Sequence, residues 1–170
     1  MTRRPSSTEY DAFYASYVAS VPEGDVLDIL ATEGRRAGTL FESIPPEKKS
    51  FRYAPGKWSV REVIGHVIDT ERIFSFRMLW MSRGDLTPLP GMDQDTFVAG
   101  AEFDSRGLAS LAREFKTLRE SNIVLGRSFS EEVLNRRGFA SGLEFSVRAL
   151  MYIMAGHAIH HVRVLEDRYL

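Results

Sequence analysis

The sequence contains no cysteine. This absence excludes a thiolate nucleophile, a disulfide framework and a cysteine-ligated zinc site. Histidine and carboxylate side chains are then the metal ligands that the chain can offer.

Neither sign of charge dominates, because 22 lysine and arginine residues stand against 23 aspartate and glutamate residues. Proteins that bind nucleic acid without sequence preference carry a broad basic field. We therefore expect no nucleic-acid partner.

The sequence also lacks a long apolar run, and no stretch approaches the length that a membrane span needs. Arg3 and Arg4 are not followed by an apolar signal region. We expect a cytoplasmic protein with no membrane partner.

Apolar residues recur at helical spacing along most of the 170-residue chain. This periodicity predicts an all-α, four-helix bundle in a single domain, with an N-terminal arm at 1–24 that carries a short helix and the bundle at 25–170. Side chains that can cap a helix stand where the main helices are expected to begin, at Asp25, Ser59, Ser105 and Ser146. Ser59 and Glu62 have the spacing of a capping box.

The segments between these helices lack clear periodicity. Residues 82–104 read as a long loop with a short helix at 94–99, and a loop of this length usually covers a site or a partner surface. Residues 139–145 are expected to form a connection without sheet pairing, and we expect no strand.

Three of the four histidines lie close together, at His157, His160 and His161. His157 and His161 are four residues apart, which places them on one helix face, with His160 to one side. The fourth, His66, lies on the apolar-periodic segment that begins at Ser59. Neutral imidazoles bind divalent transition metals, so His66, His157 and His161 are candidate ligands for zinc, nickel or iron. The alternative is a partly buried, histidine-rich helix end together with a hydrogen-bonded core histidine at position 66.

Other polar residues near these histidines have simpler interpretations. No glutamate adjoins His157, so the segment is not the HExxH motif of zinc proteases. Glu62 and Asp69, one turn either side of His66, could orient an imidazole, but capping by Glu62 and a salt-bridged or solvated face at Asp69 are simpler roles. Arg77 and Arg83 could receive an anion, and a solvated helix end is the simpler interpretation.

Several motifs together resemble the DinB-like (YfiT-like) superfamily of proposed metal-dependent enzymes. They are residues 56–66 (GKWSVREVIGH), 69–72 (DTER), 83–85 (RGD), 88–91 (PLPG) and 157–161 (HAIHH). The resemblance covers about residues 25–168. Many members continue the last histidine pair with Arg-Gly-Gln, whereas residues 162–164 here are Val-Arg-Val.

The resemblance implies a bundle with up-down-down-up connectivity, often as a homodimer. It also implies a divalent metal held by His66, His157 and His161. Similar proteins include S-transferases that use low-molecular-weight thiols and a mycothiol-dependent isomerase. The lack of cysteine is compatible with that chemistry, since the thiol would come from outside the chain.

Three functions follow as hypotheses. The first is a metal-dependent enzyme that acts on a small-molecule substrate, such as a thiol S-transferase that takes an external low-molecular-weight thiol as its second cofactor. The second is a hydrolase in which the metal activates water. The third is a non-catalytic dimeric bundle in which a metal is absent or structural, because no general base is evident.

Overall fold

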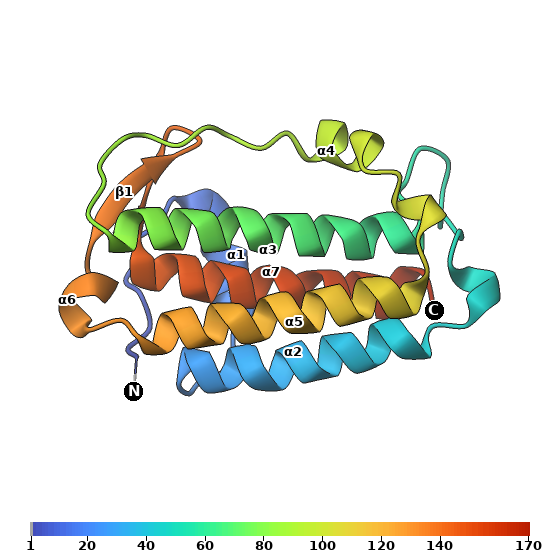
Figure 1. Ribbon diagram of the computed structural model, residues 1–170, viewed down its shortest axis with the longest axis horizontal. Coiled ribbons are helices and arrows are strands. Elements are labelled where there is room, and N and C mark those ends of the chain that lie inside the picture. Colours follow the sequence, from blue (N-terminus) through green and yellow to red (C-terminus); the bar gives the residue numbers. More distant parts are fainter. Residues whose placement is uncertain (1) are drawn as a thin grey trace.

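Four long helices form a bundle in the computed structural model, which describes residues 2–170 (Figure 1). They are α2 (Val26–Ser43), α3 (Val60–Ser82), α5 (Leu108–Arg127) and α7 (Val147–Arg168). Helices α2 and α3 each pack against both α5 and α7. The predicted four-helix bundle is therefore confirmed.

Shorter elements surround the bundle. They are η1 (Ala12–Tyr14), α1 (Ala15–Ser20), η2 (Pro46–Lys48), α4 (Gln94–Gly100), η3 (Phe103–Ser105), α6 (Glu131–Leu134), β1 (Arg137–Ala140) and β2 (Leu143–Ser146). Helix α1 lies against α7, and α4 lies on the long connection that runs alongside α3 (Figure 1). None of the helices within residues 2–170 is both long and apolar enough to cross a membrane.

Three of the four predicted caps are present. The Asp25 carboxylate accepts from the Leu27 N–H at 3.0 Å, and Ser146 Oγ accepts from the Ala149 N–H at 3.0 Å. Ser59 and Glu62 form the reciprocal capping box. Each cap satisfies a backbone donor that a helix N-terminus leaves unpaired.

The predicted cap at Ser105 is wrong, because α5 begins after Gly107. Ser105 instead ends η3, and its hydroxyl donates back to the Glu102 carbonyl at 2.8 Å. The N-cap position of α5 is Gly107, which has no side chain to accept from the first turn.

A two-stranded hairpin corrects the all-α prediction. β1 and β2 pair antiparallel, with Gly138 opposite Phe145, in the segment expected to lack pairing. Ser141 and Gly142 both have positive φ, at 55° and 74°, as a two-residue type I′ turn requires. Strands of four residues are too short to show a clear alternation of apolar and polar residues, so only this turn carried a signal in the sequence.

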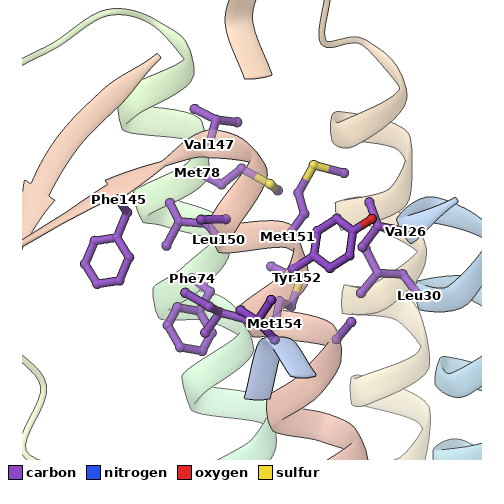
Figure 2. Packing of buried hydrophobic residues seen from close by; sticks show 14 of the residues in the cluster. Val26, Leu30, Phe74, Met78, Phe145, Val147, Leu150, Met151, Tyr152 and Met154 are labelled. Atoms are coloured by element: carbon purple, nitrogen blue, oxygen red, sulfur yellow. The ribbon is translucent and has the colours of Figure 1, made fainter. Parts of the chain in front are cut away.

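The core has two apolar halves. One half, shown in Figure 2, joins α2, α3, α7 and β2 through residues such as Leu30, Phe74, Phe145 and Met154. The other half contains Phe41, Ile64, Val67, Phe115 and Leu165. On each long helix the buried residues between the two halves are small or polar; they are Gly34 on α2, Thr70 and Glu71 on α3, Arg119 and Asn122 on α5, and Gly156 and His157 on α7.

This polar layer is internally satisfied. Arg119 donates to both Glu71 oxygens, at 2.5 and 2.6 Å, and to the Leu30 carbonyl at 3.1 Å. Asn122 donates to Glu71 at 3.1 Å. Gly34 makes room for the arginine, since a Cβ there would lie 2.7 Å from Arg119 Cγ. Buried charges are tolerated when they are paired in this way.

Candidate metal centre

Helices α3 and α7 bring three imidazoles together next to the polar layer. His66 lies in the second turn of α3, whose start is fixed by the Ser59–Glu62 capping box. His157 and His161 occupy successive turns of α7 and face α3. The three histidines that the sequence singled out are therefore neighbours, although His66 and His157 are 91 positions apart.

The ring nitrogens are close enough to share one ion. One nitrogen from each ring lies within 4.8 Å of the other two, and His66 Nε2 is 3.1 Å from His157 Nε2. Zinc–nitrogen bonds of about 2.0–2.1 Å in tetrahedral geometry place ligand nitrogens roughly 3.3 Å apart. The cluster could therefore hold a metal after small side-chain adjustments.

Burial keeps the imidazoles neutral. It lowers the pKa of His66 to about 4 and that of His161 to about 3, and it lowers the pKa of His157 well below its ordinary value. Neighbouring imidazoles add to this effect: His161 and His66 lower the pKa of His157, and His66 lowers that of His161, because two imidazolium charges so close would repel. Neutral imidazole is the form that binds metals.

Two further observations fit a metal at this point. His161 Nδ1 is buried and has no hydrogen-bond partner among the described residues, and a buried polar atom of this kind calls for a ligand. Thr70 Oγ1 lies 3.4 Å from His66 Nδ1. A proton on that Nδ1 leaves Nε2 free to bind an ion, as commonly found around metal-bound histidine.

The remaining candidates have structural roles. His160 is exposed, and its ring packs against Tyr17 and His161. Glu62 is engaged in the capping box. The charged neighbours of Asp69 are Arg72, Glu114 and Arg106, and burial raises its pKa. The surface position of His160 and the capping role of Glu62 are therefore confirmed, whereas Asp69 is half-buried and does not lie on a solvated face.

A pocket of about 250 Å³ leads to the histidines, and His66 and His157 form part of its wall. The rest of the wall comes from the N-terminal segment, α3, the long connection and the hairpin turn; it comprises Phe13, Tyr14, Tyr17, Thr70, Ile73, Phe74, Arg77, Met92, Gln94 and Ser141. The connection at 82–104 thus helps to cover a site, as its length predicted.

The N-terminal segment was not expected in this wall. Tyr17 packs edge-on against His157, with ring centroids 5.6 Å apart. Gly156 allows this contact, because a Cβ there would lie 2.0 Å from the Tyr17 carbonyl oxygen. A glycine beside a candidate ligand was the available signal, although it could not name the segment that approaches.

Arg77 was expected at a solvated helix end, and this prediction is wrong. Arg77 is only 4% exposed and lines the pocket. The sequence did hold a signal, since positions 66, 70, 74 and 77 follow one helix face.

A second pocket, of about 440 Å³, lies against His160 and His161. It shares Gln94 with the first pocket. The histidine cluster therefore has a hollow on two sides, and α4 contributes to both.

The fold and the site define a helix bundle with a largely buried three-histidine cluster at the end of a pocket. The profile of the DinB superfamily matches residues 29–165. The chain belongs to the DinB superfamily.

Individual relatives agree with this assignment. The "Putative metal-dependent hydrolase OB0413" of Oceanobacillus iheyensis is 24% identical over 136 residues, which cover 78% of this chain and 77% of that protein. The solved structure of YfiT from Bacillus subtilis, described as a probable metal-dependent hydrolase with an unusual four-helix bundle topology, matches with a TM-score of 0.71. It is 14% identical, over 97% of this chain and 90% of that chain.

A third relative has a different named activity. The mycothiol-dependent maleylpyruvate isomerase matches with a TM-score of 0.68 and 15% identity. The match covers 85% of this chain and 61% of the isomerase chain. At this identity the likeness shows a shared fold.

Proposed function

We propose that the protein is a metal-dependent enzyme in which His66, His157 and His161 hold a divalent zinc, nickel or iron ion. The observation that carries the proposal is the cluster itself: two buried imidazoles and a partly buried one, with one nitrogen of each within 4.8 Å of the others, at the end of a pocket. Two of them line that pocket directly. A ligand in the pocket would therefore reach the metal.

The bound ion would supply a Lewis acid that lowers the pKa of a thiol or water molecule. The chain's own residues would hold the ion and orient its histidine ligands. Thr70 contacts the Nδ1 edge of His66, while Tyr17 and Phe74 pack edge-on against His157 and limit water access. Within the described residues, no aspartate or glutamate lines the pocket.

The lack of a carboxylate favours an external low-molecular-weight thiol as the nucleophile. A thiol has an ordinary pKa far below that of water, so it needs less assistance from a general base. We therefore place a thiol S-transferase first. The substrate would be a small electrophilic molecule.

Hydrolysis is the second candidate, and the names of the Oceanobacillus iheyensis and Bacillus subtilis relatives favour it. Three neutral histidines leave the positive charge of the ion uncompensated, which favours ionisation of a water ligand. A hydrolase would need no thiol.

Two assays separate these activities. Metal-loaded protein is given an electrophile, such as 1-chloro-2,4-dinitrobenzene, with and without a low-molecular-weight thiol, and separately an activated ester without thiol. A transferase consumes thiol, stops when a chelator removes the metal, and recovers when the metal is returned. Ester hydrolysis without thiol would instead support the hydrolase.

His157→Ala should abolish either activity, whereas His160→Ala should retain it, because His160 is exposed and lies outside the cluster. Stoichiometric metal without turnover on either substrate would favour a non-catalytic bundle. Protein that binds no metal at all would contradict the proposal.

We also propose that the protein is a cytoplasmic homodimer. Each chain would have an arm at 1–24 and the DinB-like bundle at 25–170. The proposal also includes the up-down-down-up connectivity. Figure 1 supports that connectivity, since α2 and α7 run in one direction along the bundle and α3 and α5 in the other. Light scattering of the purified protein would test the dimer.

A further inference from the structure

Arg77 is a buried cation inside the pocket. It lies on α3, is 4% exposed, and lines the same cavity as His66 and His157. Among the described lining residues it is the only arginine, and no lysine, aspartate or glutamate accompanies it. The pocket therefore has one fixed positive charge besides any metal.

The other buried arginines are neutralised, and Arg77 is not. The chain buries four arginines within residues 2–170. Three of them contact a carboxylate: Arg61 with Asp104 at 3.3 Å, Arg119 with Glu71 at 2.5 Å, and Arg148 with Glu131 at 2.6 Å. Arg77 forms no ion pair with any described residue. A buried guanidinium without an anion is unusual, because removing it from water costs free energy that pairing normally offsets.

Uncharged groups hold the guanidinium in place. Its Nη2 donates to the Pro90 carbonyl at 3.2 Å and to Ser141 Oγ at 2.9 Å. The Tyr14 side chain also forms a hydrogen bond with the guanidinium, and burial nevertheless lowers the pKa of Arg77. The long connection and the hairpin turn thus orient the side chain through one nitrogen. Of the five guanidinium N–H groups, those that do not contact Pro90, Ser141 or Tyr14 remain for a carboxylate.

The position of Arg77 relative to the histidines limits the size of a ligand. Arg77 and His66 are 11 positions apart on α3, about 16 Å of helix rise, and both side chains line the same cavity. The cavity of about 250 Å³ is just below the usual range for drug-sized ligands. A ligand that fills this cavity would therefore place one end near Arg77 and the other near His66 and His157.

We propose that Arg77 binds the carboxylate of a small substrate whose reacting group lies at the histidine cluster. A monoanion matches the single fixed charge, whereas a phosphate dianion would leave one charge unmatched. The reacting end of this inference rests on the proposed function. Carboxylate binding at Arg77 does not, so the two can fail separately.

Matched ligands test the inference. Benzoate and benzamide have nearly the same shape and differ in charge, and their affinities can be measured by NMR titration of the protein. We expect the wild-type protein to bind benzoate about ten-fold more tightly than benzamide, since hydrogen bonds to charged groups contribute about 1.5–3 kcal/mol. Arg77→Gln should bind the two ligands equally.

Arg83→Gln is the matched control, because it removes the same charge from the exposed C-terminal end of α3. It should keep the preference for benzoate. Equal binding of the two ligands by the wild-type protein, or a preference that persists in Arg77→Gln, would overturn the inference. Tighter binding of inorganic phosphate than of benzoate would overturn the assignment to a carboxylate.

A second measurement needs no variant, in case Arg77→Gln does not fold. Benzoate bound at Arg77 should give intermolecular nuclear Overhauser effects to the rings of Tyr14 and Phe74, which line the pocket beside it. Their absence would overturn the inference.

Metal content measured in the same samples separates the two proposals. If the protein binds none of zinc, nickel and iron but still prefers benzoate, the proposed function is contradicted and the role of Arg77 is supported. If the protein binds a metal but does not prefer benzoate, the role of Arg77 is contradicted and the proposed metal site is supported.

Discussion

His66 Nε2 and His157 Nε2 lie 3.1 Å apart, although they belong to different helices. Both rings are buried, and burial lowers the pKa of each. Two neutral imidazoles at this distance share one proton or one metal ion, since two unshared lone pairs would repel. His161, from the next turn of α7, completes a set of three.

Replacing any one of the three histidines should reduce metal binding. We expect His66→Ala, His157→Ala and His161→Ala each to weaken the affinity at least about 100-fold, because two ligands hold an ion far less tightly than three. Metal analysis after dialysis against a weak chelator measures this loss. His160→Ala removes an exposed neighbouring imidazole and should retain one ion per chain. Full metal content in the other three variants would exclude the site.

The metal-free protein should lose stability as the pH falls below about 6.5. The folded-state pKa values of His66 and His161, about 4 and about 3, lie below the unfolded value of 6.5. The unfolded chain therefore binds more protons in this range, so the free energy of unfolding decreases with falling pH. This contribution is fully present above pH 6.5 and is lost progressively down to about pH 3.

Urea denaturation at pH 7.0, 6.0 and 5.0 measures that dependence. His161→Gln carries one fewer titrating group and should show a smaller decrease over the same range. An equal slope in the variant and the wild-type protein would show that His161 is not held neutral.

The Glu71–Arg119 pair should be costly to break from one side. Both side chains are only 2% exposed, so Glu71→Ala leaves an unpaired buried guanidinium. We expect a loss of roughly 3–5 kcal/mol in the free energy of unfolding, and a smaller loss for Glu71→Leu combined with Arg119→Met. Glu166→Ala, which breaks the exposed pair with Arg36, should cost less than about 1 kcal/mol. Similar losses from the buried and exposed single variants would contradict the role of burial.

Gly156→Ala should displace α1 from α7. The added Cβ would lie 2.0 Å from the Tyr17 carbonyl oxygen, so backbone must move. We expect a destabilisation of about 1–3 kcal/mol and a more accessible pocket. Thermal unfolding and hydrogen exchange of residues 15–20 measure both effects.

Gly100→Ala is the control for helix propensity, because nothing lies within 4 Å of a Cβ there. It should be neutral or stabilise the protein by up to about 1 kcal/mol. A stabilised Gly156→Ala variant would show that α1 does not pack closely on α7.

The helices and the histidine cluster could be predicted because their signals are local. Apolar spacing identified the four long helices, and side chains such as Ser59 and Ser146 mark their starts. His157 and His161 share a helix face whatever the tertiary structure. The apolar stripe around His66 indicated that its helix faces the core, and the family resemblance indicated that it faces the helix of His157 and His161.

The remaining parts of the pocket depend on contacts between distant segments. The hairpin strands are too short for periodicity, and the turn at Ser141 and Gly142 carries the signal alone. The approach of Tyr17 to Gly156 is a backbone contact that no local pattern encodes. Arg77 is buried because the connection at Pro90 and the hairpin at Ser141 cover it, and its own sequence neighbours do not reveal them.

Anomalous scattering from a crystal grown without added metal tests the central claim most directly. Data collected at the zinc, nickel and iron absorption edges locate and identify an ion together. We predict one strong peak per chain, within bonding distance of His66, His157 and His161, at one of these edges. No peak at the cluster, from crystals of untagged protein soaked with each metal in turn, would contradict the account.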